Sequence, residues 1–545
     1  MGSELLCCGE SVVDVLIIGA GLSGLRAAVE LHKAGLKIAV LERNNHVGGL
    51  CHSASTHDTA RITSIGDTHT EMLSLAKDFQ IDLVKQHRKG LSLQQRYDWI
   101  HDGPRVTENI PALEKVVWPP EDSQLSFRSL IEDPAIQRFY RRISDLSKTW
   151  HGPDALLLDA VSFLQLVEAN FLHSKVVTHE AHFLTSFLLG VHPARVSALY
   201  VLDHIASGGG LANLYFHPES PGGGAHHLRA PQGPQAFTNN LVDLLPNGTI
   251  HLSAVVNKIS QNNNTDRENA HHPSYPCIIE ATLYPSTITK AFHAKKVLLT
   301  TLPAFYSPLF SHCPGNIRLQ PPLPLHKLAS VNRHSVNHAE FATVTFYFTQ
   351  PWWREAGLSG SLDCRVTKEL DGPISWVRDT SEEDAVKKKV WTLTCWCAAE
   401  KGKEVWDWIR STYSADDLIE DQKEGWDANP VNWNGIGIPA PSTLPKEGKE
   451  VEELLRTWRY EGPGKGDAVM REPFGNVHFA GTEIAEEWRG FMEGAARSGV
   501  RGAREVIEAL KKGKNQKDGV GFEPTLSREN LKTLRSGESN LSQAP

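Results

Sequence analysis

The sequence predicts an α/β protein, and three stretches of the chain carry that prediction. Val12–Ile18 is an apolar run broken only by Asp14, which is typical of a strand buried on both faces of a parallel sheet. A helical spacing of small and apolar residues follows and stops at Gly35, and residues 37–41 form a second short apolar run. Far along the chain, Val477–Ala480 reads as another strand, and a helix rich in small residues is expected over 490–510.

The turn between the first strand and its helix reads Gly19-Ala20-Gly21-Leu22-Ser23-Gly24. Gly19 permits the tight turn, Gly21 lets a diphosphate approach backbone N–H groups, and Gly24 allows close packing of helix on strand. Strand, glycine turn, helix and second strand together predict a Rossmann-type unit with a dinucleotide diphosphate at the helix N-terminus.

Glu42 ends the second strand, where a carboxylate can accept hydrogen bonds from a ribose hydroxyl pair. An acid at this position disfavours a 2′-phosphate and hence NADP. Arg43, its neighbour, is taken as a further cofactor-binding candidate. This unit alone does not separate FAD from NAD.

Composition restricts the remaining classes. A chain of 545 residues with 22% charged and 40% hydrophobic residues is sufficient for two domains with a packed core. Its formal net charge of −8 argues against general nucleic-acid binding. The 8 cysteines form no CxxC pair and no uncharged apolar run reaches 18 residues, so we expect no metal site, no membrane span and a cytoplasmic location. We interpret His226-His227 and His271-His272 as solvated loop residues.

Two further segments carry a family resemblance. Val47-Gly48-Gly49 follows the ribose acid, and 476–508 reads NVHFAGTEIAEEWRGFMEGAARSGVRGAREVIE. Together they resemble the flavin amine oxidases, the monoamine oxidase family, and more closely its fungal branch. Weaker likeness in between brings the resemblance to about residues 12–512; it falls at 196–200, 208–211, 231–233, 300–303 and 351–360.

The resemblance implies a Rossmann-type (GR2-like) FAD-binding domain interleaved with an α+β substrate domain. The FAD-binding domain is expected at 1–66, 232–305 and 455–512, the substrate domain at 67–231 and 306–454, and a disordered tail at 513–545. Within the substrate domain, apolar spacing predicts mostly helix over 155–206, and alternation predicts a strand at Phe341–Phe348.

The same resemblance assigns cofactor contacts. It implies that Gly48, Gly49, Gly481, Glu483 and the backbones of Thr482 and Met492 contact FAD. It places Val256 against the adenine, although a plain strand residue is an equally good interpretation of Val256. The start of the last helix then faces the flavin, where its dipole favours the negative charge of reduced flavin.

Several positions depart from the family pattern. Leu50 stands where an arginine normally follows the glycine pair, and the loop at 51–67 is shorter than expected. Thr343 stands where family oxidases carry a lysine that holds a water near the flavin, and no lysine occurs from 340 to 350. The resemblance therefore implies a slow reaction of the reduced flavin with oxygen.

A cysteine that tethers the flavin in some relatives is absent from 433–445, so the sequence predicts non-covalent FAD. Phe491 stands at the position of a cage tyrosine, with Trp488 and Trp433 as further aromatic candidates at the site. Such a cage orients and desolvates a neutral amine. Each of these rings could equally be a packed core aromatic.

These residues predict an FAD-dependent oxidoreductase that oxidises an amine to an imine by hydride transfer, with O2 as acceptor. The expected partners are a small-molecule amine and O2, and a homodimer is left open. One alternative is an FAD-dependent oxidase, desaturase or cyclase of a non-amine substrate, as in fungal secondary metabolism. The other is a degenerate flavin-binding protein.

Overall fold

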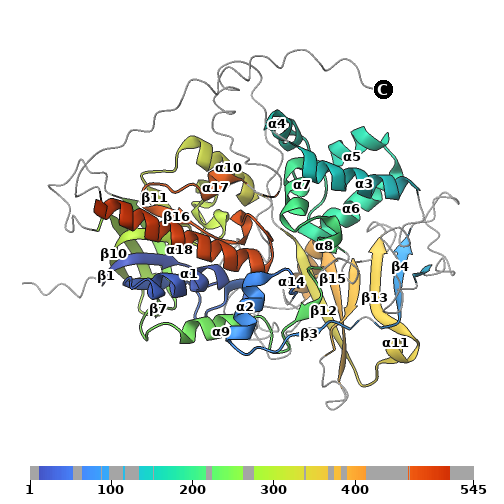
Figure 1. Cartoon of the computed structure of the whole chain (residues 1–545), viewed down its shortest axis with the longest axis horizontal. Coiled ribbons are helices and arrows are strands. Elements are labelled where there is room, and N and C mark those ends of the chain that lie inside the picture. Colours follow the sequence, from blue (N-terminus) through green and yellow to red (C-terminus); the bar gives the residue numbers. More distant parts are fainter. Residues whose placement is uncertain are drawn as a thin grey trace, which may run out of the picture.

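The computed structural model describes residues 11–52, 64–87, 89–96, 114–116, 134–150, 152–215, 224–261, 275–336, 339–365, 373–381, 390–412, 464 and 467–515. These form two halves lying side by side (Figure 1). One half is built on a large sheet with α1 and α18 across it, and the other joins a helical cluster, α3 to α8, to a second sheet.

The larger sheet has eight strands in the order β11-β8-β9-β10-β1-β2-β7, with β16 also paired to β10. β1 runs parallel to β2 and to β10, and β16 runs parallel to β10, so these four strands end at one edge of the sheet. The strands predicted near the glycine turn and near residue 477 are confirmed. The bounds are β1 Ser11–Ile18, β2 Ile38–Leu41, β7 Ile250–His251, β8 Ala254–Gln261, β9 Cys277–Leu283, β10 Ile288–Leu299, β11 Arg318–Gln320 and β16 Val477–Phe479.

Two helices cover one face of this sheet. α1 (Leu22–Lys33) and α18 (Met492–Asn515) cross closely because glycines remove side chains from the contact. A Cβ on Gly499 would lie 2.3 Å from the carbonyl oxygen of Ser23, closer than real Cβ contacts come. α18 extends five residues beyond the end predicted at Leu510. The predicted tail at 513–545 is thus helical at its start, and 516–545 lies outside the described residues.

The second half contains a six-stranded sheet in the order β12-β15-β14-β13-β4-β5. The strand predicted at Phe341–Phe348 is confirmed as β12, and the helices predicted over 155–206 are found there. The strands are β4 Leu91–Arg96, β5 Glu114–Val116, β12 Phe341–Phe348, β13 Leu358–Arg365, β14 Trp376–Asp379 and β15 Trp391–Ala398. The helices are α3 Pro134–Thr149, α4 Gly152–Ala160, α5 Phe163–Phe171, α6 Lys175–Leu189, α7 Ala198–Ser207, α8 Leu211–Tyr215, α11 Trp352–Glu355 and α14 Glu400–Thr412.

Two segments pack differently from the predicted domain boundaries. α2 (Thr70–Asp78), placed with the substrate domain, buries Met72, Leu75 and Ala76 in the same core as α1 and α18. β11 extends the larger sheet beyond the boundary at 305. Sequence spacing predicted neither the type of these two segments nor the surface on which each one packs. The other elements are β3 Val84–Lys85, β6 Leu228–Arg229, α9 Gln235–Asp243, α10 Leu325–Val336, α17 Ala468–Arg471 and the short 3-10 turns η1 Gly49–Cys51, η4 Pro303–Tyr306, η5 Pro308–Phe310 and η6 Thr482–Ile484.

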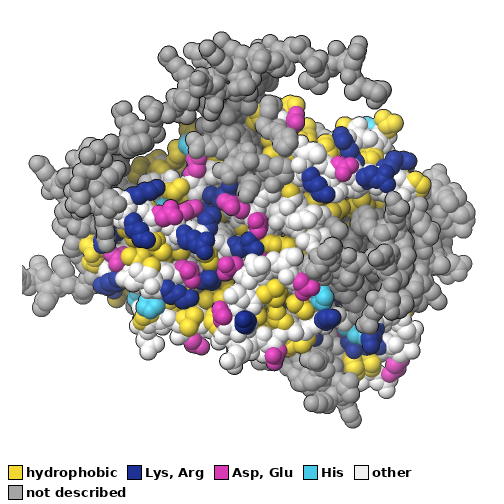
Figure 2. Space-filling model, in the orientation of Figure 1, with side chains coloured by type: hydrophobic (Ala, Val, Ile, Leu, Met, Phe, Trp, Pro, Cys, Tyr) yellow, Lys and Arg dark blue, Asp and Glu magenta, His cyan; other side chains and the backbone are white. Residues whose placement is uncertain are grey.

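The described surface mixes charges of both signs. Figure 2 shows Lys and Arg side chains interspersed with Asp and Glu over the face that carries α1 and α18. Of the helices in the described part of the chain, none is long and apolar enough to cross a membrane.

Candidate functional site

The predicted cofactor residues gather at one edge of the larger sheet. The glycine turn follows β1, Glu42 and Arg43 follow β2, Thr300 and Thr301 follow β10, and Gly481–Glu483 follow β16. Since these four strands are parallel, their carboxyl ends meet at this edge. In open α/β sheets this is where dinucleotides bind.

The glycines of the turn occupy positions that exclude side chains. Gly19 has a φ of +104°, which side-chain-bearing residues rarely adopt. A Cβ on Gly24 would lie 2.0 Å from the carbonyl oxygen of Gly19, so helix and strand require glycine for their close approach. A Cβ on Gly21 would meet only the Cα of Gly49, at 3.9 Å. The space in front of Gly21 is thus open, as a diphosphate site requires.

The second glycine pair lies directly against this turn. The Gly48 N–H donates to the Ala20 carbonyl at 2.9 Å, and Gly48 forms a bridge with Gly21. Gly48 and Gly49 have φ angles of +112° and +55°. The pair brings the segment containing Leu50 beside the glycine turn.

Glu42 connects the turn to the end of β2. Its carboxylate accepts from the backbone N–H of Ala20 at 2.7 Å and of Asn44 at 2.9 Å. Burial raises its pKa, and the two backbone hydrogen bonds oppose that rise. Each carboxylate oxygen keeps a further lone pair for a ribose hydroxyl. The Arg43 guanidinium lies over the Phe305 ring, 5.1 Å from its centroid.

Val256 lies on β8, with its side chain buried in the core of the larger sheet. The N–H of Ala254, at the start of the same strand, donates to the Glu42 carbonyl at 2.8 Å. β8 therefore begins beside the predicted ribose site, and a contact between Val256 and adenine stays a prediction.

The edge also holds buried polar atoms that lack a protein partner. Ser23 Oγ, Thr301 Oγ1 and Glu483 Oε1 are buried without a hydrogen bond to any described residue. A buried unpaired polar atom costs about 1–3 kcal/mol, so a polar ligand is expected to satisfy them. Burial raises the pKa of Glu483 to about 7. The residues at this edge therefore fit a dinucleotide such as FAD.

The loop between β16 and α18 is closed by Thr482. Its hydroxyl accepts from the Gly490 N–H at 2.9 Å and donates to the Phe491 carbonyl at 3.1 Å. Within this loop Trp488 has a φ of +54°, a strained conformation of the kind that concentrates at functional sites. The backbone N–H of Trp488 donates to the Ser207 carbonyl at 3.0 Å, which joins the loop to α7. Met492 then begins α18.

Phe491 and Trp488 open a continuous strip of rings that leads from α18 to the smaller sheet. Neighbouring ring centroids along the strip lie between 4.2 and 6.0 Å apart. We call these residues the ring strip; in order they are Trp488, His69, Phe491, His226, Phe187 and Trp376.

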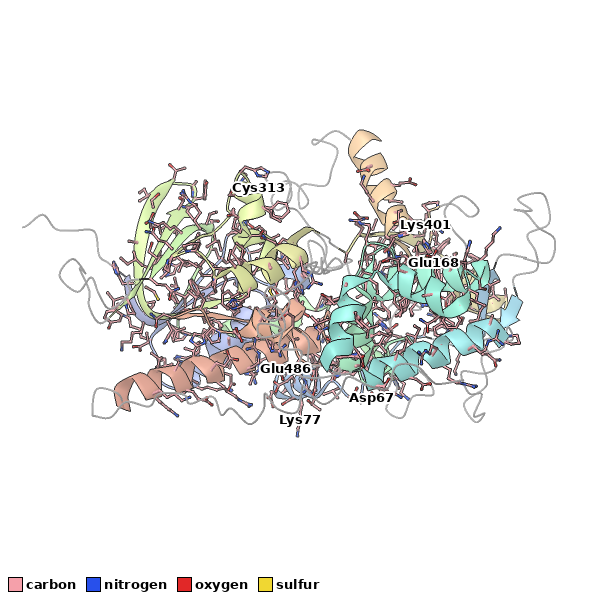
Figure 3. All side chains as sticks on the ribbon, turned by 90° about the horizontal axis from the view of Figure 1, so that it is seen from above. Asp67, Lys77, Glu168, Cys313, Lys401 and Glu486 are labelled. Atoms are coloured by element: carbon pink, nitrogen blue, oxygen red, sulfur yellow. The ribbon has the colours of Figure 1, made fainter. Side chains whose placement is uncertain are left out.

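The two histidines of the ring strip were not among the predicted site residues. The interpretation of His226-His227 as solvated is wrong: His226 is half-buried against Phe491, with Nδ1 2.8 Å from Ser64 Oγ, and His227 lies 3.4 Å from Asp67. Asp67 and Glu486 are labelled in Figure 3 near the junction of the two halves. A histidine pair in a polar loop carries no periodicity, so only the fold could show its packing.

Thr343 lies on the smaller sheet, directly across from Trp396. Trp396 is in turn paired with Trp376, and the two indoles stack with centroids 6.1 Å apart. Directly opposed residues share a face of the sheet, so Thr343 lies on the face where the ring strip ends. Thr343 itself is exposed. Trp433 lies outside the described residues.

Beneath the loop a buried ion pair joins the two halves. The Arg489 guanidinium lies 2.7 Å from the Asp203 carboxylate of α7, and both side chains are at most 1% exposed. The Gly464 N–H also donates to Asp203, at 2.6 Å. Nearby, burial lowers the pKa of His204 to about 3. This pair fixes the loop that carries Trp488 and Phe491 onto the helical cluster.

The parallel strand ends and the open glycine turn at this edge define a dinucleotide-binding protein. Residues 22–507 match the family model for flavin containing amine oxidoreductases. The chain belongs to this family, and it is an FAD-dependent oxidoreductase of the amine oxidase type. Among the residues that the structure describes, no cluster of side chains could hold a metal ion.

Relatives and solved structures cover nearly the whole chain. Flavin-containing amine oxidase A of Sus scrofa is 22% identical over 526 residues, covering 92% of this chain and 86% of its own length. Flavin-containing amine oxidase B of Homo sapiens is 21% identical, with 92% and 87% covered. Wild-type putrescine oxidase bound to putrescine superposes with a TM-score of 0.65 at 22% identity, covering 92% and 100%. Cyclohexylamine oxidase from Brevibacterium oxydans gives 0.65 at 21% identity, with 92% and 99% covered.

Proposed function

We propose that this protein oxidises a small amine with an apolar substituent to its imine, with FAD held without a covalent bond and O2 as the electron acceptor. The observation that carries the proposal is the ring strip, which runs from the start of α18 to the face of the smaller sheet that carries Thr343. Bound FAD supplies the hydride acceptor for such a reaction.

The residues of the strip have distinct tasks in this proposal. Phe491 presents an aromatic face to the amine and excludes water from it, which favours the neutral amine that can lose a hydride. Phe187 and Trp376 extend the apolar wall toward the smaller sheet and receive the amine substituent. His226 supplies a polar atom between the rings of Phe491 and Phe187.

Non-covalent attachment is supported by the state of the described cysteines. Cys51 lies in the turn η1 beside the glycine turn, at the start of the loop at 51–67. It is fully buried, and burial raises its pKa to about 12. A thiol that stays protonated is a poor nucleophile. Acid or heat treatment should therefore release intact FAD into the supernatant, and flavin remaining with the precipitate would contradict this part of the proposal.

The substrate class is tested with purified protein and a panel of primary and secondary amines, followed by peroxide release. We expect peroxide with amines that carry an apolar or aromatic substituent, and little with amines of high charge. Phe491→Ala should lower kcat/KM about tenfold or more, because burial of a Phe side chain contributes about 1.5–3 kcal/mol. Phe491→Tyr keeps the ring and is the matched control.

Anaerobic mixing separates this proposal from a non-amine substrate. Bleaching of the flavin by an amine without oxygen supports amine oxidation even where peroxide release is slow. No bleaching by any amine of the panel would overturn it. Homodimerisation and a cytoplasmic location remain predictions from the sequence, and light scattering at several concentrations tests the first.

A further inference from the structure

His69 is a fully buried histidine with one ring nitrogen left unpaired. It is 0% exposed and immediately precedes α2. The Gly66 N–H donates to its Nδ1 at 3.0 Å. Because Nδ1 accepts this hydrogen bond, Nδ1 carries no proton, and a neutral His69 must carry its proton on Nε2. The structure thus fixes the tautomer, and Nε2–H is a hydrogen-bond donor.

That donor has no acceptor among the described residues. A buried donor without an acceptor costs about 1–3 kcal/mol, so its persistence calls for an explanation. Burial also lowers the pKa of His69 to about 3, with smaller contributions from His226 and Arg497. The ring is therefore neutral near neutral pH, and the donor is permanently present.

The surroundings of His69 place this donor at the flavin end of the cofactor site. Its ring lies 4.2 Å from Trp488 and 5.8 Å from Phe491, both edge-on. Trp488 and Phe491 lie four residues and one residue before Met492, where α18 begins. His69 also lies two residues after Asp67, in the segment that leads into α2. The donor thus lies between that segment and the N-terminus of α18.

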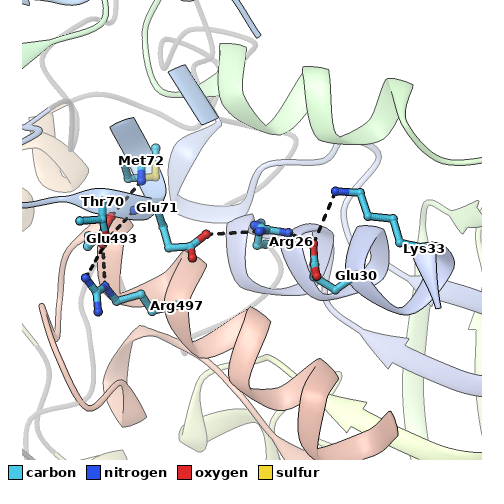
Figure 4. A network of polar contacts seen from close by, with 8 residues as sticks. All are labelled: Arg26, Glu30, Lys33, Thr70, Glu71, Met72, Glu493 and Arg497. Carbon is cyan, nitrogen blue, oxygen red and sulfur yellow. Dashed lines mark hydrogen bonds and ion pairs between the residues drawn. The ribbon is translucent and has the colours of Figure 1, made fainter. Parts of the chain in front are cut away.

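The neighbouring backbone donors are already occupied, which singles out His69. At the start of α2, the N–H groups of Glu71 and Met72 donate to the Glu493 carboxylate at 3.1 and 2.9 Å (Figure 4). A ligand at this junction therefore finds the α2 N-terminus closed. Among the described residues, the Nε2–H of His69 remains as a donor without an acceptor.

We propose that the Nε2–H of His69 donates a hydrogen bond to an acceptor atom of the flavin ring when FAD is bound. This contact would position the ring and would stabilise the negative charge of reduced flavin more than neutral oxidised flavin. It rests on the FAD cofactor and not on the identity of the amine. The competing arrangement is a weak N–H contact to the face of the Trp488 indole.

The test compares substitutions in full-length protein reconstituted with FAD. His69→Asn keeps an acceptor oxygen near the Nδ1 position for the Gly66 N–H and removes the distal donor, whereas His69→Gln places an amide N–H near the Nε2 position. The two-electron midpoint potential is measured by equilibration with a redox dye, and FAD affinity by titration of the flavin-free protein. Neither measurement requires an amine.

We expect His69→Asn to shift the equilibrium toward oxidised flavin about tenfold, which is about 30 mV more negative for a two-electron couple. His69→Gln should remain within about twofold of wild type. His478→Asn changes an equally buried histidine that contacts Glu505 instead of the ring strip, and it should leave the potential unchanged. If His69→Asn does not fold, His69→Phe keeps a ring against Trp488 and should show the same negative shift.

A wild-type potential in both His69→Asn and His69→Phe would overturn the proposal and assign the donor to the Trp488 face. That result would leave amine oxidation intact. Conversely, a shifted potential in a protein that no amine reduces would support the His69 contact and refute the amine substrate.

Discussion

We predict that Thr343 limits how fast the reduced enzyme reacts with oxygen. Its side chain lies on the face of the smaller sheet where the ring strip ends. The Thr343 side chain is short and uncharged, so it cannot place a positive charge near the flavin as a lysine would. Thr343→Lys should accelerate reoxidation by about tenfold, because an ammonium near a reacting anion contributes on the order of 1–2 kcal/mol. Anaerobic reduction by an amine should change little.

Stopped-flow absorbance of the two half-reactions measures this effect. Thr345→Lys is the matched control, because Thr345 lies two residues further along the same face. Its hydroxyl is hydrogen-bonded to the Thr394 hydroxyl, with the two oxygens 3.0 Å apart. Fast reoxidation of the wild type, or a Thr343→Lys protein that changes only the reductive step, would show that Thr343 does not face the flavin.

The ion pair between Arg489 and Asp203 is buried where the loop before α18 meets α7. Arg489→Met leaves the Asp203 carboxylate buried without its cation, which should lower the free energy of unfolding by about 3–5 kcal/mol. Arg489→Met with Asp203→Leu should cost less than the single change, since no buried charge remains. Urea unfolding measures both, and Lys403→Met, in an exposed pair with Asp407, should stay within about 0.5 kcal/mol. An equally stable Arg489→Met protein would refute this account.

At the scale of elements, α2 receives its N-terminal cap from a helix more than 400 residues away. His69, at its N-cap position, makes no side-chain cap, and the Glu493 carboxylate of α18 accepts from the first backbone N–H groups instead. Arg497 holds the same carboxylate at 2.6 Å (Figure 4). The two helices are therefore joined through one buried acid at the start of each.

Glu493→Gln should weaken this junction, because an amide NH2 would face backbone N–H groups and the charge on Arg497 would lose its partner. We expect a loss of about 2–3 kcal/mol in the free energy of unfolding, within the range for charge-assisted hydrogen bonds. Glu487→Gln is the control: this acid also pairs with Arg497 but is 55% exposed. Equal effects of the two substitutions would mean that the cap contributes nothing.

Elements with strong periodicity could be predicted from the sequence, and contacts between distant elements could not. The strand at Phe341–Phe348 and the unit from β1 to β2 follow from local apolar spacing, as does the helix that becomes α18. The cap on α2 depends on a carboxylate 421 residues away from Met72, for which spacing gives no signal. For the same reason, neither the packing of α2 in the core with α1 and α18 nor the pairing of β11 with β8 was predicted.

At the scale of the whole molecule, the motifs predicted which residues gather at one edge of the larger sheet, and the fold showed which rings of the two halves meet at Phe491. Gly19, Glu42 and Glu483 each follow a parallel strand, so the motifs alone place them together. His69 and His226 sit in loops without periodicity, and only the meeting of the two halves brings their rings to Phe491. Local motifs therefore predict one part of the candidate site, and contacts between distant segments form the other part.

Buried titratable groups in both halves also make the stability of the flavin-free protein depend on pH. Burial lowers the pKa of His69, His182 and His204 to about 3, so the unfolded chain binds more protons than the folded chain between about pH 3 and 6.5. These histidines make stability rise with pH across that window. Glu483 acts in the opposite direction, since burial raises its pKa from 4.5 to about 7.

Because the folded chain keeps the Glu483 proton that the unfolded chain loses, its contribution is fully present below about pH 4.5 and is lost as pH rises through about 7. Glu483→Gln removes this dependence. Relative to the variant, the wild type should therefore lose on the order of 3 kcal/mol between pH 4.5 and 8. Urea unfolding of the flavin-free proteins at several pH values measures the difference, with Glu486→Gln, 42% exposed, as control. A difference between wild type and Glu483→Gln that stays constant with pH would show that folding does not raise the pKa of Glu483.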